Sequence, residues 1–531
     1  MASGSAPDLR ARLEKFRREF LGLDLTEPVV REGGAPGIRR RVYLDTGATA
    51  LMPRLLHESL AAYCTKALAN SHSSAHRAAR VTSREIARAR AVIETFVGAR
   101  AGTDPASQVA VFAGNGATAA LNLLADALFP PEVRILLRGG RSRDPELRAI
   151  FGDLRDWATS RGVDAADVLH RNLVVVSRIE HHSNILPWMR AVGARNLRFP
   201  ALTLDGQLDL HDLARILREE GDRVRLVAVA GASNVTGVIT PVREVARLTH
   251  AAGAELVVDG AQWAPHARVR MHDPDDEAGD IDYLALSGHK LYAPGSRGVL
   301  IARRRAFAGP EAVGDVGGGM ADVVSTAGFS ASPDLAQREE GGTPNLPGSV
   351  ALGLVVQALM SFGMDLVEEH ERGLVAAGTE RLRRIPGLAL YGPDPARAAR
   401  VAVFTFNVGE LPHGFVAAAL SDACNVAVRN GSFCAQLYVR HLLGDGDGDA
   451  LLDEAPLGGC TALPGLVRAS CGVYTGDEDL EALEDGLRFV VSHADELSSS
   501  YDLGPGGEWV HRARPSAPAF EIATEVARYF R

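Results

Sequence analysis

Lysine is scarce in this chain. Of its 57 lysine and arginine residues, only Lys15, Lys66 and Lys290 are lysines. Nearly every position that needs a positive charge carries arginine, so a lysine at a particular place calls for its own explanation. The chain as a whole has a net charge of −9. That charge excludes the basic footprint expected of a nucleic-acid-binding protein.

Cysteine and long apolar runs are also scarce. No apolar run approaches the length of a membrane span, and the charged segment 1–20 lacks the apolar core of a secretory signal. The cysteines are odd in number, scattered, and without the spacing of a zinc site. We therefore expect a reducing, cytoplasmic setting, with no disulfide framework, metal site, nucleic acid or membrane partner. The five cysteines are Cys64, Cys424, Cys434, Cys460 and Cys471.

Apolar segments that alternate with amphipathic helices dominate the first two thirds of the chain. With 46% hydrophobic and 23% charged residues, the composition is that of an ordinary globular protein. The alternation predicts a mostly parallel sheet with helices on both faces, whose ligands bind beyond the carboxyl ends of the strands. Helical patterns lie at 115–128 and 241–254. Strands that end in polar residues are expected within 108–114, 171–184, 224–237, 255–262 and 280–290.

The length of 531 residues exceeds what one compact core usually holds, so we expect more than one domain. A single long helix is expected at about 349–384, where the character of the chain changes. Two loop-rich segments, about 133–170 and about 441–463, look inserted. The predicted division is an N-terminal helix and linker (1–40), a large α/β domain (41–345), a small α+β domain (346–495) and a C-terminal extension (496–531).

Lys290 lies in "LALSGHKLYAPGSRG", at the end of a predicted strand and before a Gly/Pro loop. A lysine amine is a nucleophile only when it is neutral, and burial lowers its pKa. In a pocket it could form a Schiff base with a carbonyl group, which the permanently charged arginine cannot do. Taken alone, a surface lysine in a turn is the commoner explanation.

Two segments of the sequence offer groups that could hold a phosphate. Gly116, Ala117 and Thr118 open a helix directly after a strand, where free N–H groups and the helix dipole favour a phosphate. Ser287 and His289 flank Lys290 with groups able to reach the same phosphate. Each feature has an ordinary alternative, namely a plain strand-to-helix turn or a structural histidine.

Asp259 ends the apolar run "AELVVDGAQ". A carboxylate at the end of a buried strand needs a partner, because an unpaired buried charge is costly. A protonated pyridine nitrogen would serve, although an exposed Asp in a turn is the simpler alternative. A phosphate cradle, a carboxylate and a Schiff-base lysine are together the requirements of pyridoxal 5'-phosphate (PLP).

The sequence resembles the class V aminotransferase superfamily of fold-type I PLP enzymes, most of all the cysteine desulfurases and selenocysteine lyases. The resemblance implies a fold-type I α/β architecture with a mostly parallel, seven-stranded-type sheet in the large domain. The matching motifs span about residues 40–490 and are highly specific when taken together in this order. They are "YLDTGATALMP", "NSHSSAH", "GATAALN", "EHHSNILPW", "SNVTGVITPV", "VVDGAQWAPH", "LSGHKLYAPGSRG", "EGGTPN", "VRNGSFCA" and "VRASCGVYT".

The same resemblance assigns roles around the cofactor ring. Lys290 would carry the PLP and act in catalysis, and Asp259 would pair with the pyridine nitrogen. His181, the first histidine of "EHH", would stack on the ring as a further catalytic residue. Asn234 and Gln262 would lie beside the ring hydroxyl.

Other roles concern the phosphate and the substrate. Thr343 of "EGGTPN" would reach the phosphate from the neighbouring subunit of a homodimer. Arg468 would clamp the substrate carboxylate, a task suited to a bidentate guanidinium, with Arg429 as a second substrate-binding arginine. Within the same subunit, the phosphate would be held by Ala117, Thr118, Ser287 and His289.

Cys434 stands where desulfurases place the cysteine that takes sulfur. Its thiolate, favoured by Arg429, would attack the sulfur of bound cysteine and leave a persulfide and alanine, with a sulfur-acceptor protein as a possible partner. The alternative is that Cys434 is a small hydrophobic side chain, the common fate of a free cysteine. Cys460 and Cys471 are expected to be structural.

The sequence departs from the family pattern at several positions, two of which are Ala119, where a glutamate is usual, and Phe433, where a histidine is frequent. These departures leave the PLP residues intact but keep the substrate open. The chain could instead be an aminotransferase, an epimerase or a C–S lyase acting on another amino acid, with Cys434 incidental. A non-catalytic scaffold is the third alternative. The intact set of four residues weighs against it, namely Lys290, Asp259, His181 and Arg468.

Overall fold

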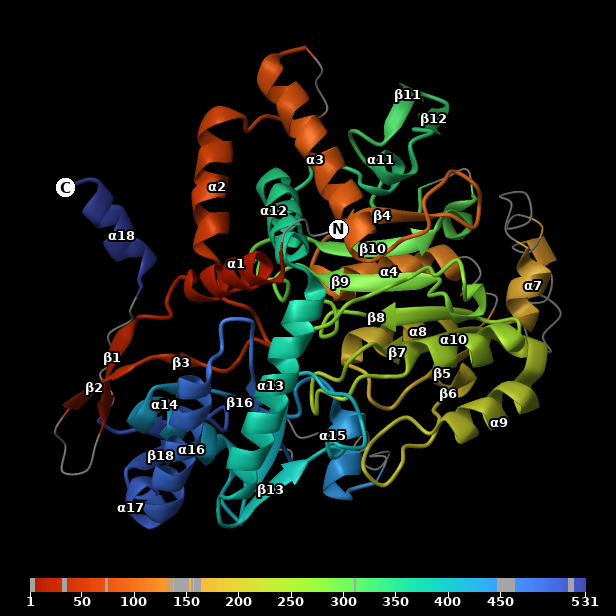
Figure 1. Cartoon of the computed structure of the whole chain (residues 1–531). Coiled ribbons are helices and arrows are strands. Elements are labelled where there is room, and N and C mark those ends of the chain that lie inside the picture. Colours follow the sequence, from red (N-terminus) through yellow and green to blue (C-terminus); the bar gives the residue numbers. More distant parts are fainter. Residues whose placement is uncertain are drawn as a thin grey trace.

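A large sheet with helices on both faces forms one part of the molecule, and a smaller sheet with its own helices forms another (Figure 1). The predicted insertions at about 133–170 and 441–463 lie mostly outside the described residues, as does Cys460. The computed structural model describes residues 5–30, 36–71, 75–130, 164–309, 312–446, 464–513 and 520–531, with a few single positions between 131 and 163.

The large sheet has seven strands, and all of them except β10 run parallel. The central strands are buried on both faces, which explains why they read as continuous apolar runs rather than as alternating ones. The predicted α/β fold with a mostly parallel sheet is thus confirmed. The order across the sheet is β4 (Gln108–Ala113), β10 (Gly298–Arg303), β9 (Tyr283–Ser287), β8 (Glu255–Asp259), β7 (Val224–Ala230), β5 (Leu173–Val176) and β6 (Leu197–Arg198).

Strand β10 was not anticipated from the sequence. It runs antiparallel between β4 and β9 and so closes the sheet beside the strand that carries Lys290. Its first residue, Gly298, lies against the turn that opens the helix after β4. A Cβ atom at Gly298 would collide with the carbonyl oxygen of Gly116, so only glycine allows this close approach.

Two layers of helices cover the large sheet, and alternate residues of each strand point to one layer or the other. In β4, Ala110 and Phe112 join one core cluster, whereas Val109 and Val111 join the other. The first cluster includes side chains from α2 (Arg54–Lys66), α3 (Arg77–Phe96), α9 (Leu210–Glu220), α10 (Val242–Ala251) and α12 (Leu346–Phe362). The second includes side chains from α4 (Gly116–Leu128), α7 (Ala165–His170) and α8 (Leu186–Val192).

The small sheet is antiparallel and has its own apolar core. A short parallel pair, β3 (Val42–Tyr43) with β15 (Val426–Ala427), brings the motif "YLDTGAT" against this part of the chain. The strands of the small sheet, in order, are β13 (Leu388–Tyr391), β14 (Val403–Val408), β17 (Leu466–Ser470) and β16 (Arg429–Gly431). The helices that pack on it are α13 (Met364–Arg383), α14 (His413–Cys424) and α16 (Asp477–Ser492).

The prediction of a single helix at about 349–384 is wrong, because the structure has two helices there. Gly363, with a φ of 89°, separates α12 from α13, and the two helices are bent by 82°. Side chains of α12 belong to the core of the large sheet, whereas most apolar side chains of α13 belong to the core of the small sheet. Met364, Leu366 and Val367 at the start of α13 still pack in the core of the large sheet, so the packing changes within α13, between Val367 and Leu374. Among the described residues no single helix is long and apolar enough to cross a membrane. Only α12 and α13 taken together reach that length and composition, and they are bent against each other.

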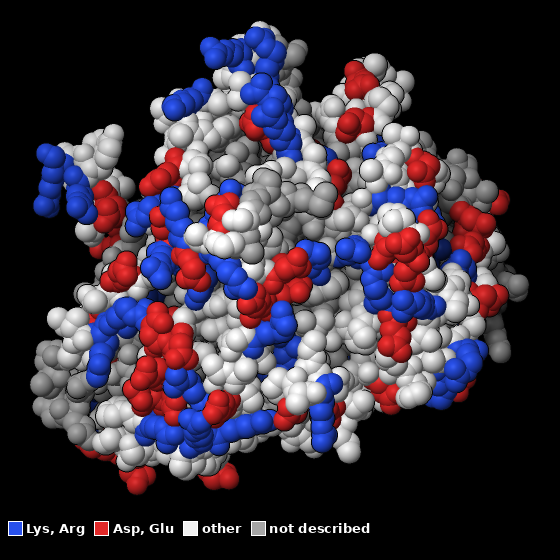
Figure 2. Space-filling model, in the orientation of Figure 1, with Lys and Arg blue, Asp and Glu red and all other residues white. Residues whose placement is uncertain are grey.

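The N-terminal helix α1 (Ala6–Arg18) lies where it was predicted, but the expected linker forms a hairpin of β1 (Thr26–Val30) and β2 (Pro36–Arg40). The view in Figure 2 shows acidic and basic side chains mostly interspersed over one face. The remaining elements are β11 (Ala321–Ser325), β12 (Gly328–Ala331), α11 (Leu335–Glu339), α15 (Gln436–Leu443), α17 (Ala494–Ser498), β18 (Tyr501–Leu503), β19 (Trp509–His511) and α18 (Ile522–Tyr529).

Candidate active site

A cavity of about 190 Å³ lies beyond the carboxyl ends of the parallel strands, where residues that follow β4, β7, β8 and β9 meet residues of β16 and β17. Every predicted site residue except Thr343 lines it, although the role of each stays a prediction. Those lining residues are Ala117, Thr118, His181, Asn234, Asp259, Gln262, Ser287, His289, Lys290, Arg429, Cys434 and Arg468.

One end of the cavity is the N-terminus of α4. The N–H of Ala117 donates to Ser287 Oγ at 2.9 Å, and the hydroxyls of Thr118 and Ser183 are 2.6 Å apart. A Cβ atom at Gly116, which has a φ of 63°, would come within 2.9 Å of Ser287 Oγ. The glycine therefore keeps open a cradle bounded by N–H and hydroxyl groups at a helix N-terminus, which fits a phosphate.

Lys290 follows the end of β9, and Asp259 is the last residue of β8. Burial lowers the pKa of Lys290 to about 8, helped by the charges of Arg468 and Arg429 and opposed by Asp259. Burial raises the pKa of Asp259, which accepts a hydrogen bond from the N–H of Ala261 at 3.0 Å. A neutral amine on Lys290 is thus accessible not far above neutral pH, beside a buried carboxyl group.

Two histidines of the cavity are uncharged at neutral pH. Burial, with the nearby charge of Lys290, lowers the pKa of His181 to about 3 and that of His289 to about 4. The N–H of Ser183 donates to His181 Nδ1 at 3.1 Å, so the proton of the neutral ring lies on Nε2. A flat, neutral imidazole in this position is suited to stack on an aromatic ring.

Gln262 leaves a buried polar atom unsatisfied. Its Nε2 is 3.3 Å from His266 Nε2, and His266 Nδ1 is 2.8 Å from Glu371 Oε1. The Oε1 atom of Gln262 is buried and has no hydrogen-bond partner among the described residues. Leaving such an atom unpaired costs about 1–3 kcal/mol, so this wall of the cavity fits a ligand with a polar ring substituent.

Arg468 is 2% exposed and is held from several directions. Its Nη2 donates to Asp45 Oδ1 at 3.1 Å and its Nη1 to the carbonyl oxygen of Asn234 at 2.9 Å. Its Cζ lies 4.9 Å from the centre of the Phe433 ring, at cation–π distance. A Cβ atom at Gly47 would come within 3.1 Å of the guanidinium carbon, so the glycine of "DTGAT" makes room for it.

Cys434 is exposed and occupies a strained turn at the mouth of the cavity. Phe433 and Cys434 both have positive φ values, of 54° and 52°, which are unfavourable for residues with side chains. Hydrogen bonds hold the turn: Asn234 Nδ2 donates to the Phe433 carbonyl at 2.9 Å, and the His182 N–H donates to the Cys434 carbonyl at 2.7 Å. The thiol is therefore presented from a fixed backbone.

Thr343 lies outside the cavity and is exposed, and its hydroxyl accepts a hydrogen bond from Asn70 Nδ2 at 3.3 Å. Its predicted role in a neighbouring subunit stays a prediction. Cys471 is buried, and burial raises the pKa of its thiol well above the usual value, which suits a structural side chain.

Sequence reasoning missed two acidic residues that support the site. Asp45 bridges Arg468 and Arg429, whose Nε donates to it at 3.2 Å. Glu180 lies fully buried, where its carboxyl group accepts hydrogen bonds from the Ala230 N–H and from Asn184 Nδ2, each at 2.7 Å. Both residues lie inside motifs of the family resemblance, "YLDTGAT" and "EHHSN". Their place in these motifs is the sequence feature that could have identified them.

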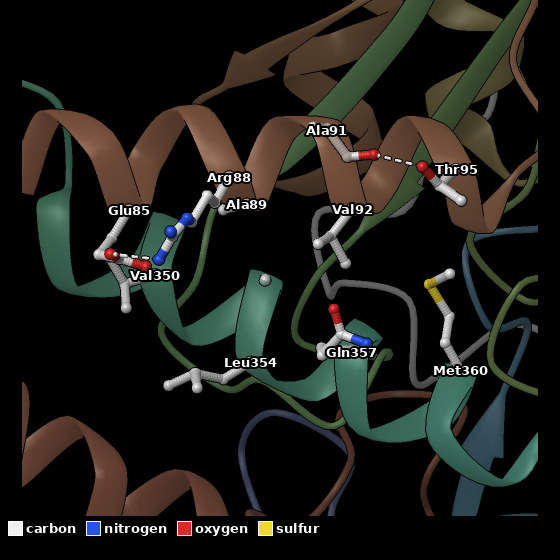
Figure 3. Close-up of a pocket in the computed structure, with 11 residues that line it drawn as sticks. Glu85, Arg88, Ala89, Ala91, Val92, Thr95, Val350, Leu354, Gln357 and Met360 are labelled. Carbon is white, nitrogen blue, oxygen red and sulfur yellow. Dashed lines mark hydrogen bonds and ion pairs between the residues drawn. The ribbon is translucent and has the colours of Figure 1, made fainter. Parts of the chain in front are cut away.

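A second hollow, of about 410 Å³, lies between α3 and α12 (Figure 3). Its lining is mainly apolar. Of its polar groups, Arg88 pairs with Glu85 at 3.0 Å, and the Thr95 hydroxyl donates to the Ala91 carbonyl at 2.8 Å. None of its lining residues is a buried titratable group. This larger groove therefore offers no catalytic chemistry.

Comparisons with known proteins agree with the motifs. The sequence model of the family "Aminotransferase class-V" matches residues 42–138 and 159–483. A probable cysteine desulfurase of Halalkalibacterium halodurans is 30% identical over 449 residues, covering 84% of this chain and 92% of that protein. A probable cysteine desulfurase 2 of Mycobacterium leprae is 32% identical over 455 residues, covering 85% of this chain and 92% of that protein. The apo structure of a cysteine desulfurase from Thermococcus onnurineus NA1 superimposes with a TM-score of 0.67 at 27% identity, covering 93% of this chain and 100% of that one.

Proposed function

This chain belongs to the class V aminotransferase family, and from that premise we propose that it is a PLP-dependent enzyme that takes sulfur, or selenium, from L-cysteine or its selenium analogue and leaves alanine. One observation carries the proposal. An exposed thiol, Cys434, is fixed at the mouth of the cavity that contains Lys290 and Arg468.

The residues present fit PLP. The cradle at Gly116 suits the phosphate, the buried Asp259 suits the pyridine nitrogen, and the unpaired Gln262 Oε1 lies where a ring substituent can meet it. Lys290, with its pKa lowered to about 8 mainly by burial, suits covalent attachment. When bound there, PLP would supply an electron sink for bonds at an amino-acid substrate.

The chain's own residues would then divide the work. Asp259 would keep a proton on the ring nitrogen, and the neutral ring of His181 would cover one face of the cofactor. Arg468 would bind the substrate carboxylate through its guanidinium fork. Lys290, released by the incoming substrate amine, would move a proton to and from the substrate carbon.

Sulfur transfer would be the task of Cys434. Its thiolate sulfur attacks the substrate sulfur, a sulfur–sulfur bond forms, and the bond from that sulfur to the substrate Cβ breaks. The electron pair of the broken bond stays with Cβ, which takes up a proton to give alanine. The sulfur remains on Cys434 as a persulfide, from which an acceptor protein would take it; this chemistry suits a reducing cytoplasm.

The alternative keeps the cofactor and changes the reaction. Phe433 precedes Cys434 in the chain at a position where a histidine would have assisted proton transfer, and its ring instead lies against the guanidinium of Arg468. If Cys434 is incidental, the cavity would serve an aminotransferase, an epimerase or a C–S lyase acting on another amino acid. A non-catalytic scaffold remains only if the protein binds no PLP.

Incubation with L-cysteine, with sulfide and alanine assayed together, tests the proposal. We expect equal amounts of the two products in the presence of a thiol reductant, and one added sulfur on the peptide that carries Cys434, seen by mass spectrometry. Cys434→Ser should abolish the formation of the products and the added sulfur. Cys64→Ser, which changes an exposed thiol on α2 that does not line the cavity, should abolish neither. Full activity of Cys434→Ser would instead support the alternative reaction.

We also propose a homodimer in which Thr343 of each subunit serves the phosphate site of the other. The support is that Thr343 is exposed and does not line the cavity of its own chain. Light scattering should give twice the chain mass. A hybrid dimer of one Lys290→Ala subunit and one Thr343→Val subunit tests whether the threonine crosses the interface. If it does, the site that keeps Lys290 receives the intact Thr343 of the other subunit. The restored site should bind PLP with wild-type affinity, so the hybrid should have about half of the wild-type lysine-bound PLP and activity per dimer. No gain over Thr343→Val alone would contradict the crossing.

A further inference from the structure

Three buried polar side chains form a series of contacts that begins at the wall of the cavity. Gln262, which lines the cavity, places its Nε2 atom 3.3 Å from His266 Nε2. On the other side of the ring, His266 Nδ1 lies 2.8 Å from Glu371 Oε1. The second carboxylate oxygen, Glu371 Oε2, accepts a hydrogen bond from the N–H of Ala402 at 2.8 Å. The series thus joins the cavity to α13 and to the residue that precedes β14.

His266 and Glu371 have no part in the proposed reaction, yet both are 2% exposed and neither lines the cavity. An ionised carboxylate can only accept hydrogen bonds, so Glu371 requires a proton on His266 Nδ1. A charged ring would carry a second proton on Nε2 and turn it toward the N–H groups of Gln262, where two donors repel. The ring is therefore neutral, and the lone pair on its Nε2 accepts from Gln262.

The protonation of His266 decides which end of the Gln262 amide is left for a ligand. Because Nε2 of Gln262 donates to the ring, the carbonyl oxygen is the atom that remains. This Oε1 atom is buried and has no hydrogen-bond partner among the described residues. The wall of the cavity at Gln262 therefore presents a hydrogen-bond acceptor that still needs a donor.

We propose that His266 and Glu371 are positioning residues, which hold Gln262 Oε1 toward the cofactor so that the ring hydroxyl is kept in its protonated form. A protonated hydroxyl donates to Oε1, whereas an ionised one would meet its lone pairs. The inference rests on the proposed function only in requiring that PLP binds in this cavity, and it does not depend on the reaction that follows.

The protonation of the ring hydroxyl can be followed in the absorbance of the bound cofactor. The ionised form absorbs near the visible edge, and the protonated form absorbs at shorter wavelength, in the near ultraviolet. The ratio of the near-visible band to the near-ultraviolet band, recorded at fixed pH without substrate, therefore reports which end of the Gln262 amide faces the ring. No turnover is needed.

Glu371→Gln reverses the whole series while keeping its volume. The carbonyl of the new amide must accept from Ala402, so its nitrogen donates to His266 Nδ1 and moves the ring proton to Nε2. Gln262 then accepts from His266 and turns its own nitrogen toward the cavity. A donor now faces the ring hydroxyl, and the band ratio should rise by about tenfold, the worth of one hydrogen bond. An unchanged ratio in a folded, PLP-loaded variant would overturn the proposal.

Two comparisons separate this effect from a loss of packing. In a Gln262→Met background the amide is absent, so adding Glu371→Gln should change the ratio by less than about twofold. A rise that persists in that background would also overturn the proposal, because it could not pass through Gln262. Asp280→Asn is the matched control, since Asp280 is a buried partner of His272 Nδ1 at 2.7 Å and does not line the cavity. It should leave the ratio as it is.

If Glu371→Gln does not fold, His266→Leu carries the test. Leucine cannot accept from Gln262, so the amide is free to turn and the ratio should rise by at least about threefold, whereas no rise would contradict the proposal. Failure of the proposed function is visible separately. Bands that shift as expected, without sulfide from cysteine, would refute the desulfurase activity alone. Sulfide production with bands that do not shift would refute this inference alone, and wild type without either band would refute both.

Discussion

The cavity at the strand ends and the groove between α3 and α12 are both hollows, and they differ in whether they contain buried polar atoms without hydrogen-bond partners. The groove is larger, about 410 Å³ against about 190 Å³, yet none of the polar side chains that line it is buried, and two of its polar contacts are drawn in Figure 3, Arg88 with Glu85 and Thr95 with the Ala91 carbonyl. In the cavity, Gln262 Oε1 and Arg468 Nε are buried without a hydrogen-bond partner among the described residues. Buried atoms without a partner also occur elsewhere among the described residues, so the candidate site is distinguished by having two of them in the lining of one cavity, and not by its volume.

The same contrast appears in the titratable groups. The cavity holds Lys290 and His181, whose pKa values are lowered to about 8 and about 3, mainly by burial. The groove holds Arg88 and Glu85, which are paired at the surface. Burying groups so that their pKa values shift lowers the stability of the folded protein. Such shifted pKa values are therefore expected where the chemistry of a site requires them. Substitutions in the two hollows should therefore have very different consequences.

The largest effect is expected for Lys290→Ala. Loss of the amine should remove the near-visible absorbance band of the bound cofactor and lower turnover by at least about 1,000-fold. Lys290→Arg should fail in the same way, because a guanidinium keeps the charge but cannot attack an aldehyde. An unchanged absorbance band with retained activity would show that the cavity is no more catalytic than the groove.

Arg468→Lys should have the next largest effect. The charge remains, but the two-pronged contact with a carboxylate is lost, so KM for cysteine should rise by about 10- to 100-fold with a smaller change in kcat. Steady-state kinetics with cysteine measure this. Arg88→Lys in the groove is the matched control, and it should leave both constants as they are. Equal changes in KM and kcat for Arg468→Lys and Arg88→Lys would contradict the view that the cavity binds substrate and the groove does not.

The pH dependence of cofactor loading should be intermediate in size. Only the neutral amine attacks the cofactor aldehyde, and the pKa of Lys290 is lowered to about 8, first by burial. Loading of cofactor-free protein should therefore accelerate by about tenfold per pH unit below pH 8 and level off above it. The rate of growth of the absorbance band measures this, with pyridoxal as a control for ionisation of the phosphate. A rate that still rises steeply above pH 10 would mean that burial does not perturb this lysine.

The smallest effect is expected for Gln357→Ala, which changes an exposed side chain of the groove. Turnover and melting temperature should both stay close to wild type, with kcat/KM within about twofold. Kinetics and thermal unfolding measured side by side check this. A large loss of activity would show that the groove is coupled to the cavity.

The parts of the site that could be predicted from the sequence follow simple local rules. Lys290 and Asp259 stand at the ends of apolar strands, and Ala117 and Thr118 open a helix, so each is identifiable from its own neighbourhood. The order of the motifs along the chain resembles that of the class V family and so predicted the fold. The mostly parallel sheet was therefore predictable, although its antiparallel strand β10 was not, because its short apolar stretch, 299–302, carries no sign of direction.

The parts that were missed depend on contacts between distant segments. Asp45 meets Arg468 across 423 positions of sequence, and nothing local to either residue announces the pairing. The break at Gly363 was missed because apolar residues continue on both sides of it, and only the fold shows that the later part of α13 serves a different core from α12. Tertiary packing decides such features, and a single sequence does not display it.

The distribution of the three lysines has a practical consequence for spectroscopy. Lys15 and Lys66 are exposed on α1 and α2, and Lys290 is the only lysine that lines the cavity. Protein grown with isotopically labelled lysine would carry just three labelled side chains in a chain of 531 residues. Two of them would report on bulk solvent and serve as internal standards. The third would act as a resonance tag built into the reaction centre, without any engineering of the surface.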